Sequence, residues 1–432
     1  MATCTPRALV GAFVLTVWFW ILRFLSRVAV IFPVRLFVFD AEAFISNIER
    51  KFGRKLSLAK NPIWIEGLRL AASKTNTECP ESMLVGRWNR KAYVEWNILR
   101  PLLIAEAALA RHPDISSVPI SKPIFISGTG RNGSTLLQDI MCCYPSVRYL
   151  TIPDCMDIAP LDESREFDPV WRQERQELWR DNIEIHQRSI MNLGQNSHMI
   201  SDKSPEECIV LLSKYLFWFP LLTFDGNCDG VEWSLSQPAF TRKAYEMYKQ
   251  ELKLLLYYDQ KIDGIDPSTV QFVLKAPLHV VYHDVIRKVF PDAIIIRLHR
   301  DPVEVTASFC SMFTAIHKAY PTRHDHDPTH LGKMKLKWVL LACNRMVEEG
   351  VGEGMIDVRY LDFKKDPVGT SAKIAAAVGL EHNEDVEQKI TTYLKERRRQ
   401  PQGTNPHNPA LYGLNPTAIR QDLSSYCEMF RV

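Results

Sequence analysis

The sequence IFISGTGRNGSTLLQDIMCC occupies residues 124–143 and joins a short apolar run to a glycine-rich turn and a stretch with helical spacing. Glycines let the backbone fold tightly around an oxyanion, and the first turn of the next helix offers unpaired N–H groups. The stretch therefore predicts a strand at 124–127, a phosphate-binding turn, and a helix over 134–143. A turn that serves only the architecture is the alternative.

The turn departs from the Walker A loop at one position. The spacing from Gly128 to Gly133 matches that loop, but Ser134 stands where its lysine should be. A standard ATPase or GTPase is therefore disfavoured. Arg131 lies earlier in the turn and can supply the missing cation, and the hydroxyls of Ser134 and Thr135 can act as further donors.

Short apolar runs alternate with helical stretches along the second half of the chain. Runs rich in β-branched residues lie at 270–274 and 293–298, and a further strand is expected at 355–360. Helices are expected at 280–290, 302–318, 331–349 and 367–379. This alternation predicts an α/β, P-loop-like three-layer fold in which helices flank a central parallel sheet.

The rest of the chain is predicted to be mainly helical. Residues 150–265 contain the clearest amphipathic stretch, at 242–258, and residues 90–110 form a helical stretch interrupted by Pro101. We expect a catalytic domain over 115–432, a helical membrane-proximal region over 41–114, and a hydrophobic segment over 1–40.

A cation and an imidazole follow the predicted strand at 270–274. Lys275 and His279 belong to the sequence KAPLH, and ligands collect at the carboxyl edge of an open α/β sheet. A lysine there can stabilise a departing anion, and a histidine can deprotonate an acceptor hydroxyl. A histidine is more often a structural residue, however, and His283 on the next turn is a rival.

An arginine follows the predicted strand at 293–298. Arg300 begins the sequence RDP, and Ser308 lies about two helical turns further on, where it can face the same anion. The planar guanidinium group suits a dianionic phosphate because it makes two charge-assisted hydrogen bonds. The alternative is that Arg300 pairs with Asp301 or Glu304 in a capping network.

The order of these motifs resembles that of the sulfotransferases that use 3′-phosphoadenosine 5′-phosphosulfate (PAPS). The resemblance is carried by the loop GTGRNGSTLL and by VLKAPLHVVYHDVIRKVFPDAIIIRLHRDPVEVTASFCSM at 273–312. It covers about residues 115–430 and includes Tyr360-Leu361-Asp362 and Tyr426 to Phe430. The resemblance implies transfer of a sulfuryl group from PAPS to a hydroxyl acceptor, by in-line displacement.

The resemblance also implies which residues bind PAPS. The 5′-phosphosulfate is expected on the loop, at Gly130, Arg131, Asn132, Gly133, Ser134 and Thr135. Arg300 and Ser308 are expected to hold the 3′-phosphate. The basic-glycine motif usual near the C-terminus of such enzymes is degraded over 397–407, so no nucleotide contact is expected there.

The catalytic group implied by the resemblance is His279 as general base, with Lys275 and Arg131 neutralising the leaving group. His279 lies four residues after the lysine, whereas the best-known soluble members have their histidine two residues after it. Glu206 or Glu207 therefore remains open as the base. Since cations and loop amides can neutralise the leaving group, no metal is expected.

Composition excludes little. The net charge of +3 is too small to indicate a nucleic-acid partner. The ten cysteines lack the spacing of a zinc site, and we expect them to be reduced thiols.

Two rival functions stay open: another P-loop nucleotide-dependent transferase, such as a kinase, and a non-catalytic, membrane-anchored nucleotide-binding scaffold. The sequence does not indicate an oligomeric state.

The N-terminal segment is strongly hydrophobic. Ala8 to Leu22 carries no charge, and apolar character continues to Phe39, although about 20 residues are needed to cross a bilayer. A single-pass or monotopic membrane segment is expected, with a cleaved signal peptide and a buried helix as alternatives. The partners expected from the whole sequence are therefore a membrane, through this segment, and a hydroxyl acceptor.

The orientation predicted for this segment leaves the catalytic domain in the cytosol. Arginines are more frequent after the apolar stretch, at 23, 27 and 35, than before it, at 7. The sequon at Asn132 lies in the predicted phosphate loop, where a glycan would block the site. A lumenal Golgi or endoplasmic-reticulum location is the alternative.

The acceptor is predicted only by class. Leu211 to Phe224 is unusually apolar and aromatic, and can line a pocket for a lipophilic alcohol or form an ordinary core helix. A small-molecule or lipid alcohol and a carbohydrate hydroxyl are the acceptors considered.

Overall fold

The computed structural model describes residues 6–31, 38–79, 84–189, 201–218, 229–317, 324, 327–399 and 408–432. The strands are β1 (Ile124–Gly128), β2 (Val147–Arg148), β3 (Gln271–Lys275), β4 (Ile294–His299) and β5 (Met355–Arg359). The helices before β3 are α1 (Pro6–Ile31), α2 (Ala41–Phe52), α3 (Pro62–Glu78), α4 (Leu84–Val94), α5 (Arg100–Arg111), α6 (Ser134–Met141), α7 (Ile152–Met156), α8 (Pro169–Ser189), α9 (Cys208–Leu216), α10 (Asp229–Ser236) and α11 (Pro238–Asp263). Those after β3 are α12 (His283–Val289), α13 (Pro302–Ile316), α14 (Pro328–Glu349), α15 (Tyr360–Lys365), α16 (Pro367–Val378), α17 (Glu384–Arg399), α18 (Pro416–Asp422) and α19 (Ser424–Phe430).

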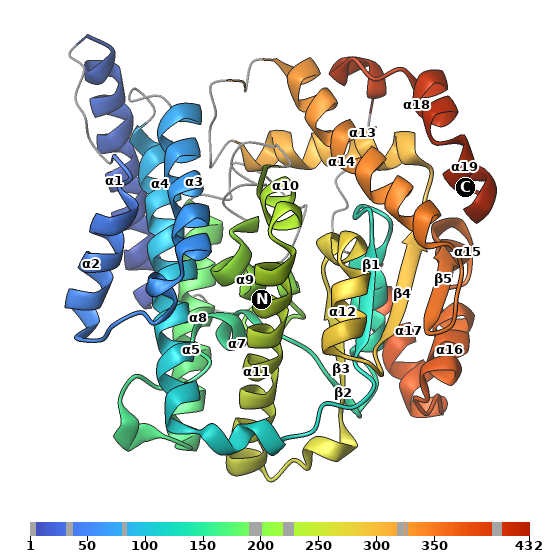
Figure 1. Ribbon diagram of the computed structural model, residues 1–432, viewed down its shortest axis with the longest axis horizontal. Helices are drawn as coiled ribbons and strands as arrows, with labels where there is room; N and C mark the ends of the chain where they lie inside the picture. Colours follow the sequence, from blue (N-terminus) through green and yellow to red (C-terminus); the bar gives the residue numbers. More distant parts are fainter. Residues whose placement is uncertain are drawn as a thin grey trace.

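The five strands form one parallel sheet in the order β2-β3-β1-β4-β5. Central β1 pairs Ile126 with Lys275 of β3, and Gly128 with Leu298 of β4. This register brings the carboxyl ends of β3, β1 and β4 to one edge. The predicted parallel sheet flanked by helices is confirmed (Figure 1).

Side chains alternate between the two faces of the sheet. Ile124 and Ile126 of β1 pack with residues of α6, α16 and α17 in one core cluster. Phe125 points the other way, into a larger core that includes α11 and α12. Both faces of every central strand are therefore buried, which explains why these strands are continuous apolar runs rather than alternating ones.

The helices before β1 share the larger core with the sheet. Trp64 of α3 and Leu102 of α5 belong to the same buried cluster as Phe125. Glu106 of α5 accepts the backbone N–H groups of Ser57 and Leu58, at 2.6 and 2.8 Å, and so ties the turn before α3 to α5. These helices therefore pack as part of one structure with the sheet.

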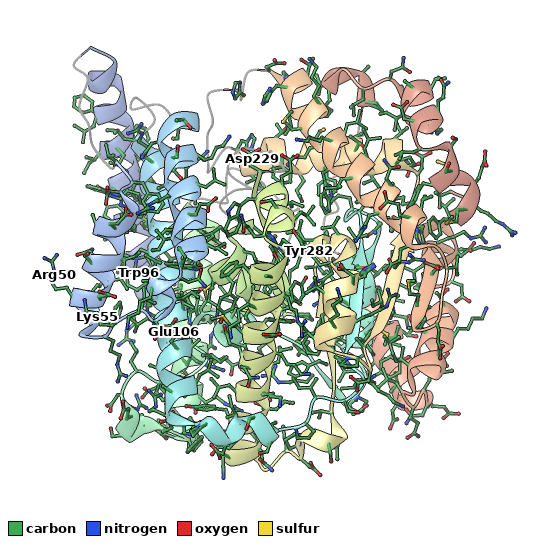
Figure 2. The ribbon with its side chains drawn as sticks, in the orientation of Figure 1. Arg50, Lys55, Trp96, Glu106, Asp229 and Tyr282 are labelled. Atoms are coloured by element: carbon green, nitrogen blue, oxygen red, sulfur yellow. The ribbon has the colours of Figure 1, made fainter. Side chains whose placement is uncertain are left out.

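Side-chain positions follow this layering. Arg50 and Lys55 lie at the outer edge of the N-terminal helices, whereas Tyr282 lies in the interior (Figure 2). The indole of Trp218 stacks on Tyr282 with ring centroids 5.1 Å apart. Aromatic rings thus fill the space between the helical region and the sheet.

Predicted element boundaries are close to those observed, with two informative differences. The short strand β2 was not predicted, because two residues carry no periodicity. The predicted interruption at Pro101 takes the form of a π-helical turn, Glu95–Leu99, followed directly by α5. A proline ring cannot donate a helical hydrogen bond, and a wider turn before it accommodates that loss.

Helix α1 contains the hydrophobic segment at 8–22 and packs against α4 and α8. Phe19 meets Trp88 of α4 edge-on, with ring centroids 5.6 Å apart. Across the portion of the chain with described coordinates, we find no helix that combines the length and apolar character needed to cross a membrane.

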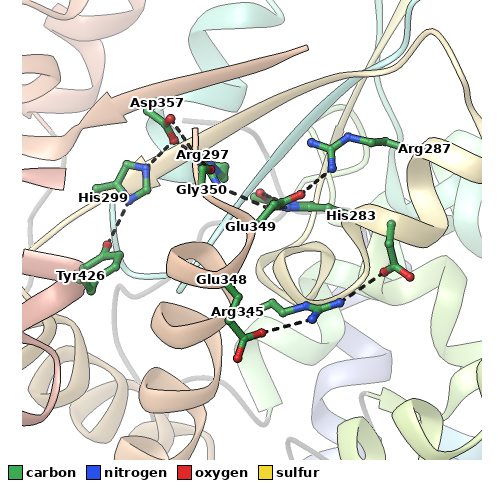
Figure 3. A network of polar contacts seen from close by, with 12 residues as sticks. His283, Arg287, Arg297, His299, Arg345, Glu348, Glu349, Gly350, Asp357 and Tyr426 are labelled. Atoms are coloured by element: carbon green, nitrogen blue, oxygen red, sulfur yellow. Dashed lines mark hydrogen bonds and ion pairs between the residues drawn. The ribbon is translucent and has the colours of Figure 1, made fainter. Parts of the chain in front are cut away.

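Charged side chains form a network behind the ends of β1, β4 and β5 (Figure 3). Glu349, at the end of α14, accepts hydrogen bonds from His283 Nδ1 at 2.6 Å and from Arg287 at 2.7 Å. Asp357 of β5 accepts from Arg297 and from His299, at 2.7 and 2.8 Å. Burial disfavours ionisation of Glu349, but His283 and Arg287 more than offset it and lower its pKa to about 2.

Glu349→Gln is expected to lower the free energy of unfolding by about 3 kcal/mol at pH 7, since it leaves the buried side chains of His283 and Arg297 without the carboxylate that they contact. The depressed pKa of Glu349 means that its stabilisation is complete above about pH 4.5 and is lost as the pH falls toward 2. Urea unfolding at several pH values measures both effects.

Glu348→Gln provides the matched control. Glu348 is exposed and pairs with Arg345 at 3.3 Å, so its loss should cost no more than about 0.5 kcal/mol. Equal effects of the two substitutions would contradict a stabilising role for the network.

Candidate active site

The loop between β1 and α6 is shaped by its glycines and by contacts with neighbouring strands. Gly133 has a φ of 92°, and a Cβ there would lie 2.8 Å from the Tyr360 ring. Gly130 has a φ of 83°, and a Cβ there would lie 2.7 Å from Phe309. Larger residues would meet both backbone strain and a clash, so the close approach of these rings requires glycine.

Asn132 anchors the loop to the sheet. Its Nδ2 donates to the Leu298 carbonyl at the end of β4, at 2.7 Å, and its Oδ1 accepts from the Ser134 N–H at 3.4 Å. The side chain is fully buried. A glycan on Nδ2 has no room beside this buried side chain, so the sequon at Asn132 is incompatible with glycosylation of this folded structure.

Two arginines and a serine meet beside the loop. Arg131 donates from Nε to Ser308 Oγ of α13 at 3.1 Å, and Arg300 donates to the Arg131 carbonyl at 2.8 Å. Arg300 also pairs with Glu304 and lies over the Tyr360 ring, 4.5 Å from its centroid. Burial, and next the charge of Arg300, lower the pKa of Arg131. Two cations held this close favour an anionic ligand.

Lys275 lies on the other side of β1. Its ammonium forms an ion pair with Glu207 and donates to Thr135 Oγ1 of α6 at 3.4 Å. Lys275 is buried, whereas the Glu207 side chain is 25% exposed. Lys275 continues the face of β3 that carries Val273, which packs in the same cluster as α6. The strand period therefore turns this lysine toward the loop.

His279 lies on the opposite face of the sheet. It is fully buried, contacts the Phe125 ring edge-on at 5.1 Å, and shares a hydrogen bond of 2.9 Å between its Nδ1 and the Tyr245 hydroxyl. Burial, and next the charge of His283, lower the pKa of His279 to about 3. Its Nε2 has no hydrogen-bond partner within the described chain.

His283, the rival considered from the sequence, belongs to the polar network. Its Nε2 shares a 2.8 Å hydrogen bond with Ser127 of β1, and its Nδ1 contacts Glu349. Both ring nitrogens are therefore engaged.

Sequence reasoning missed two residues that shape the site. Tyr360 follows β5, covers Gly133 and stacks under Arg300. Trp338 of α14 donates from its indole to the Thr129 carbonyl in the loop at 2.8 Å. Tyr360 was noted only as part of a motif, and Trp338 lies 209 positions from its partner. Neither pattern signals proximity to the loop.

The residues that meet at this edge are suited to an extended anion. Arg131, Arg300 and Ser308 lie on the β4 side of the loop, and Lys275 with Thr135 on the β3 side. The N–H groups at the start of α6 lie between them. The arrangement therefore offers cationic and hydroxyl groups on both sides of the loop, as binding of an extended anion requires.

This parallel sheet and its glycine-rich loop define a P-loop-like α/β protein. Residues 123–384 match the family described as the Sulfotransferase family. Since the match covers more than half of the chain, the protein belongs to the sulfotransferase family. Among curated proteins, none matches it.

Solved structures of two bacterial sulfotransferases have a similar fold. Sulfotransferase STF9 from Mycobacterium avium is 22% identical, with a TM-score of 0.71 over 91% of this chain and 97% of that one. Sulfotransferase STF1 from Mycobacterium tuberculosis is 19% identical, with a TM-score of 0.66 over 90% of this chain and 100% of that one. At these identities the likeness establishes the fold.

Gly133→Ala is expected to destabilise the protein more than Gly379→Ala does. Both glycines have positive φ, at 92° and 80°, so an alanine is strained by about 1 kcal/mol at either position. Only Gly133 faces a close neighbour, Tyr360, and that clash should add about 1–2 kcal/mol. Urea unfolding measures the difference, and equal losses would contradict the tight packing of the loop under Tyr360.

Proposed function

We propose that this sulfotransferase moves a sulfuryl group from PAPS to a hydroxyl acceptor. The observation that carries the proposal is the meeting of Arg131, Arg300 and Ser308 beside the loop. Ordinary nucleotides lack a 3′-phosphate, and this second cationic set gives such a group a binding partner. When bound, PAPS supplies the sulfuryl group that is transferred.

Each side of the loop has its own role in this proposal. Arg300 and Ser308 hold the 3′-phosphate, because guanidinium and hydroxyl donors satisfy several of its oxygens at once. Residues 130–135 hold the 5′-phosphosulfate through backbone N–H groups and hydroxyls. Lys275 neutralises the charge that develops on the leaving oxygen, in a site where positioning and electrostatic stabilisation carry most of the catalysis.

For the general base we favour Glu207 over His279. Glu207 is partly exposed and contacts Lys275, and a carboxylate beside the cation that neutralises the leaving oxygen is suited to accept the proton of an acceptor hydroxyl. His279 is enclosed between β1 and α11, and exposure of its ring would require those elements to move apart. The unpartnered Nε2 of His279 is the observation that favours the histidine.

The acceptor we propose is a small-molecule or lipid alcohol, with a carbohydrate hydroxyl as the alternative. The apolar segment at 211–224 bears on this choice only in part, since residues 219–224 lie outside the described chain. The described part, residues 211–218, is buried in the hydrophobic core, where Phe217 packs on Trp64 and Trp218 packs on Tyr282. That portion supports the core-helix interpretation rather than a pocket lining.

The donor site is tested by calorimetric binding of 3′-phosphoadenosine 5′-phosphate against adenosine 5′-phosphate, ADP and ATP. The bisphosphate should bind most tightly, and Arg300→Ala should weaken its binding by about 10- to 100-fold while removing its advantage over adenosine 5′-phosphate. Arg345→Ala is the matched control, because Arg345 lies in an exposed ion pair with Glu348 and should leave binding unchanged.

The other outcomes favour the rival functions. Binding of ATP that equals or exceeds that of the bisphosphate, with no effect of Arg300→Ala, would favour a kinase-like transferase. Binding of the bisphosphate without transfer to any hydroxyl compound would favour a non-catalytic scaffold, and binding of no nucleotide would remove the donor site itself.

The base is tested by transfer of labelled sulfate from PAPS to dodecanol, 2-naphthol and N-acetylglucosamine. Glu207→Gln should lower kcat by about 10²- to 10⁴-fold, because a neutral amide cannot accept the acceptor proton. His279→Gln should leave kcat within a few-fold of wild type. Glu206→Gln is the control, since Glu206 is buried and its carboxylate accepts the backbone N–H of Glu207 at 2.8 Å.

Nucleotide affinity and thermal stability of the same variants separate catalysis from folding. A loss of kcat confined to His279→Gln, with nucleotide affinity retained, would assign the base to the histidine.

A further inference from the structure

Helix α1 has one side packed against the protein. Ala8, Ala12, Phe19 and Leu22 are buried, and Phe19 and Leu22 form a small cluster with Leu84 of α4. On the α8 side, a Cβ at Gly11 would lie 2.5 Å from the Ile185 side chain. The helix is therefore held along its length by two other helices and is integrated into the fold.

The other side of α1 is apolar and uncovered. Its exposed large side chains are Leu9, Val10, Phe13, Val14, Val17, Trp20, Ile21 and Phe24. Phe13 is 70% exposed and Trp20 is 68% exposed. Thr16 lies on the same exposed side of the helix and is polar, but its hydroxyl donates a hydrogen bond to the Ala12 carbonyl at 2.7 Å. Its polar hydrogen is therefore already used within the helix. A continuous apolar face of this kind marks an interaction surface.

Charge distinguishes between the two occupants that suit such a face. Residues 1–39 contain arginines at 7, 23, 27 and 35 and no aspartate or glutamate. A symmetric pair of copies would bring these positive segments together, since a two-fold interface places each patch against itself. An anionic lipid surface complements the net positive charge of this segment as well as the apolar face of α1, and tryptophan is suited to its headgroup boundary.

The neighbours of α1 decide how it can meet a membrane. Helix α8 runs against α1 and carries Arg180, Asp181 and Glu184 within the turns before Ile185. If α1 crossed the bilayer in this arrangement, these charges would enter the hydrocarbon with it, which is strongly unfavourable. If α1 lies flat, only its outer face enters the lipid and α8 stays in water.

We propose that α1 binds this protein to an anionic membrane surface, lying in the plane of the interface with its outer face, Leu9 to Phe24, in the lipid. The inference is independent of sulfuryl transfer. Of the two membrane arrangements expected from the sequence, the proposal favours the monotopic one over the single-pass one. Anionic lipids are typical of the cytoplasmic leaflet. A surface-bound enzyme also meets lipophilic acceptors where they are concentrated.

The test is co-sedimentation of the full-length protein with vesicles of phosphatidylserine and phosphatidylcholine, compared with phosphatidylcholine alone. The protein should pellet with the mixed vesicles and less with the neutral ones, and high salt should reduce pelleting. Phe13→Glu/Trp20→Glu should lower the bound fraction by about tenfold or more, because charge replaces the two most exposed side chains of the inserted face.

Val351→Glu/Leu411→Glu is the matched control. Val351 and Leu411 are exposed apolar residues away from α1, and their replacement should leave vesicle binding unchanged. Equal binding by the α1 variant and wild type, or no binding by wild type, would overturn the proposal. Circular dichroism and urea unfolding verify that both variants fold, and Phe13→Ser/Trp20→Ser offers a milder second variant.

Two further readouts address the alternatives. In analytical ultracentrifugation, a wild-type dimer that the α1 variant converts to monomer, without vesicle binding, would show that a second copy covers the face. Brominated lipids quench tryptophan fluorescence, and so they measure how deep Trp20 lies in the bilayer. The part of the quenching that disappears in Trp20→Phe should be greatest for lipids whose bromines lie near the headgroups. Quenching greatest at the bilayer centre would overturn the in-plane arrangement.

Discussion

The hydrogen bond from Asn132 to the carbonyl of Leu298 joins the loop after β1 to the end of β4, and the geometry of the site follows from it. Because β1 is central and parallel to both neighbours, its loop lies between the ends of β3 and β4. With the loop held there, Arg131 reaches Ser308 and the Arg300 side chain reaches the loop backbone. The sheet therefore sets the spacing between the cationic groups, and the loop sets their direction.

The polar network behind the site gives the same edge its rigidity. Ser127, immediately before the loop, contacts His283, and His283 contacts Glu349 at the end of α14. Helix α14 in turn contacts the loop through Trp338. The loop is thus supported from the sheet and from a helix that arrives more than 200 residues later in the chain. Such support limits the reorganisation needed when charge develops during a reaction.

Much of the fold could be predicted from local patterns, and the site only in part. The predicted strands at 270–274, 293–298 and 355–360 correspond to β3, β4 and β5 with boundaries displaced by about one residue, and the first two were signalled by β-branched runs, which suit parallel strands buried on both faces. The positions of Lys275 and Arg300 followed from the rule that loops after parallel strands share an edge. The position of His279 did not follow, since the 3₁₀ helix Pro277–Val281 carries it to the opposite face of the sheet, against Phe125.

Local sequence was sufficient for the strand, loop and helix around residues 124–143 and for the kind of chemistry that their residues support. Backbone preference and side-chain period act over a few residues, so they can be read without the rest of the chain. The pairing of Lys275 with Glu207 joins positions 68 residues apart. The apolar sequence of α1 likewise did not reveal which of its faces would pack on α4 and α8. The ion pair and the packing face of α1 both depend on how the helices pack in three dimensions. That packing is decided by many weak contacts between distant parts of the chain, which no single stretch of sequence contains.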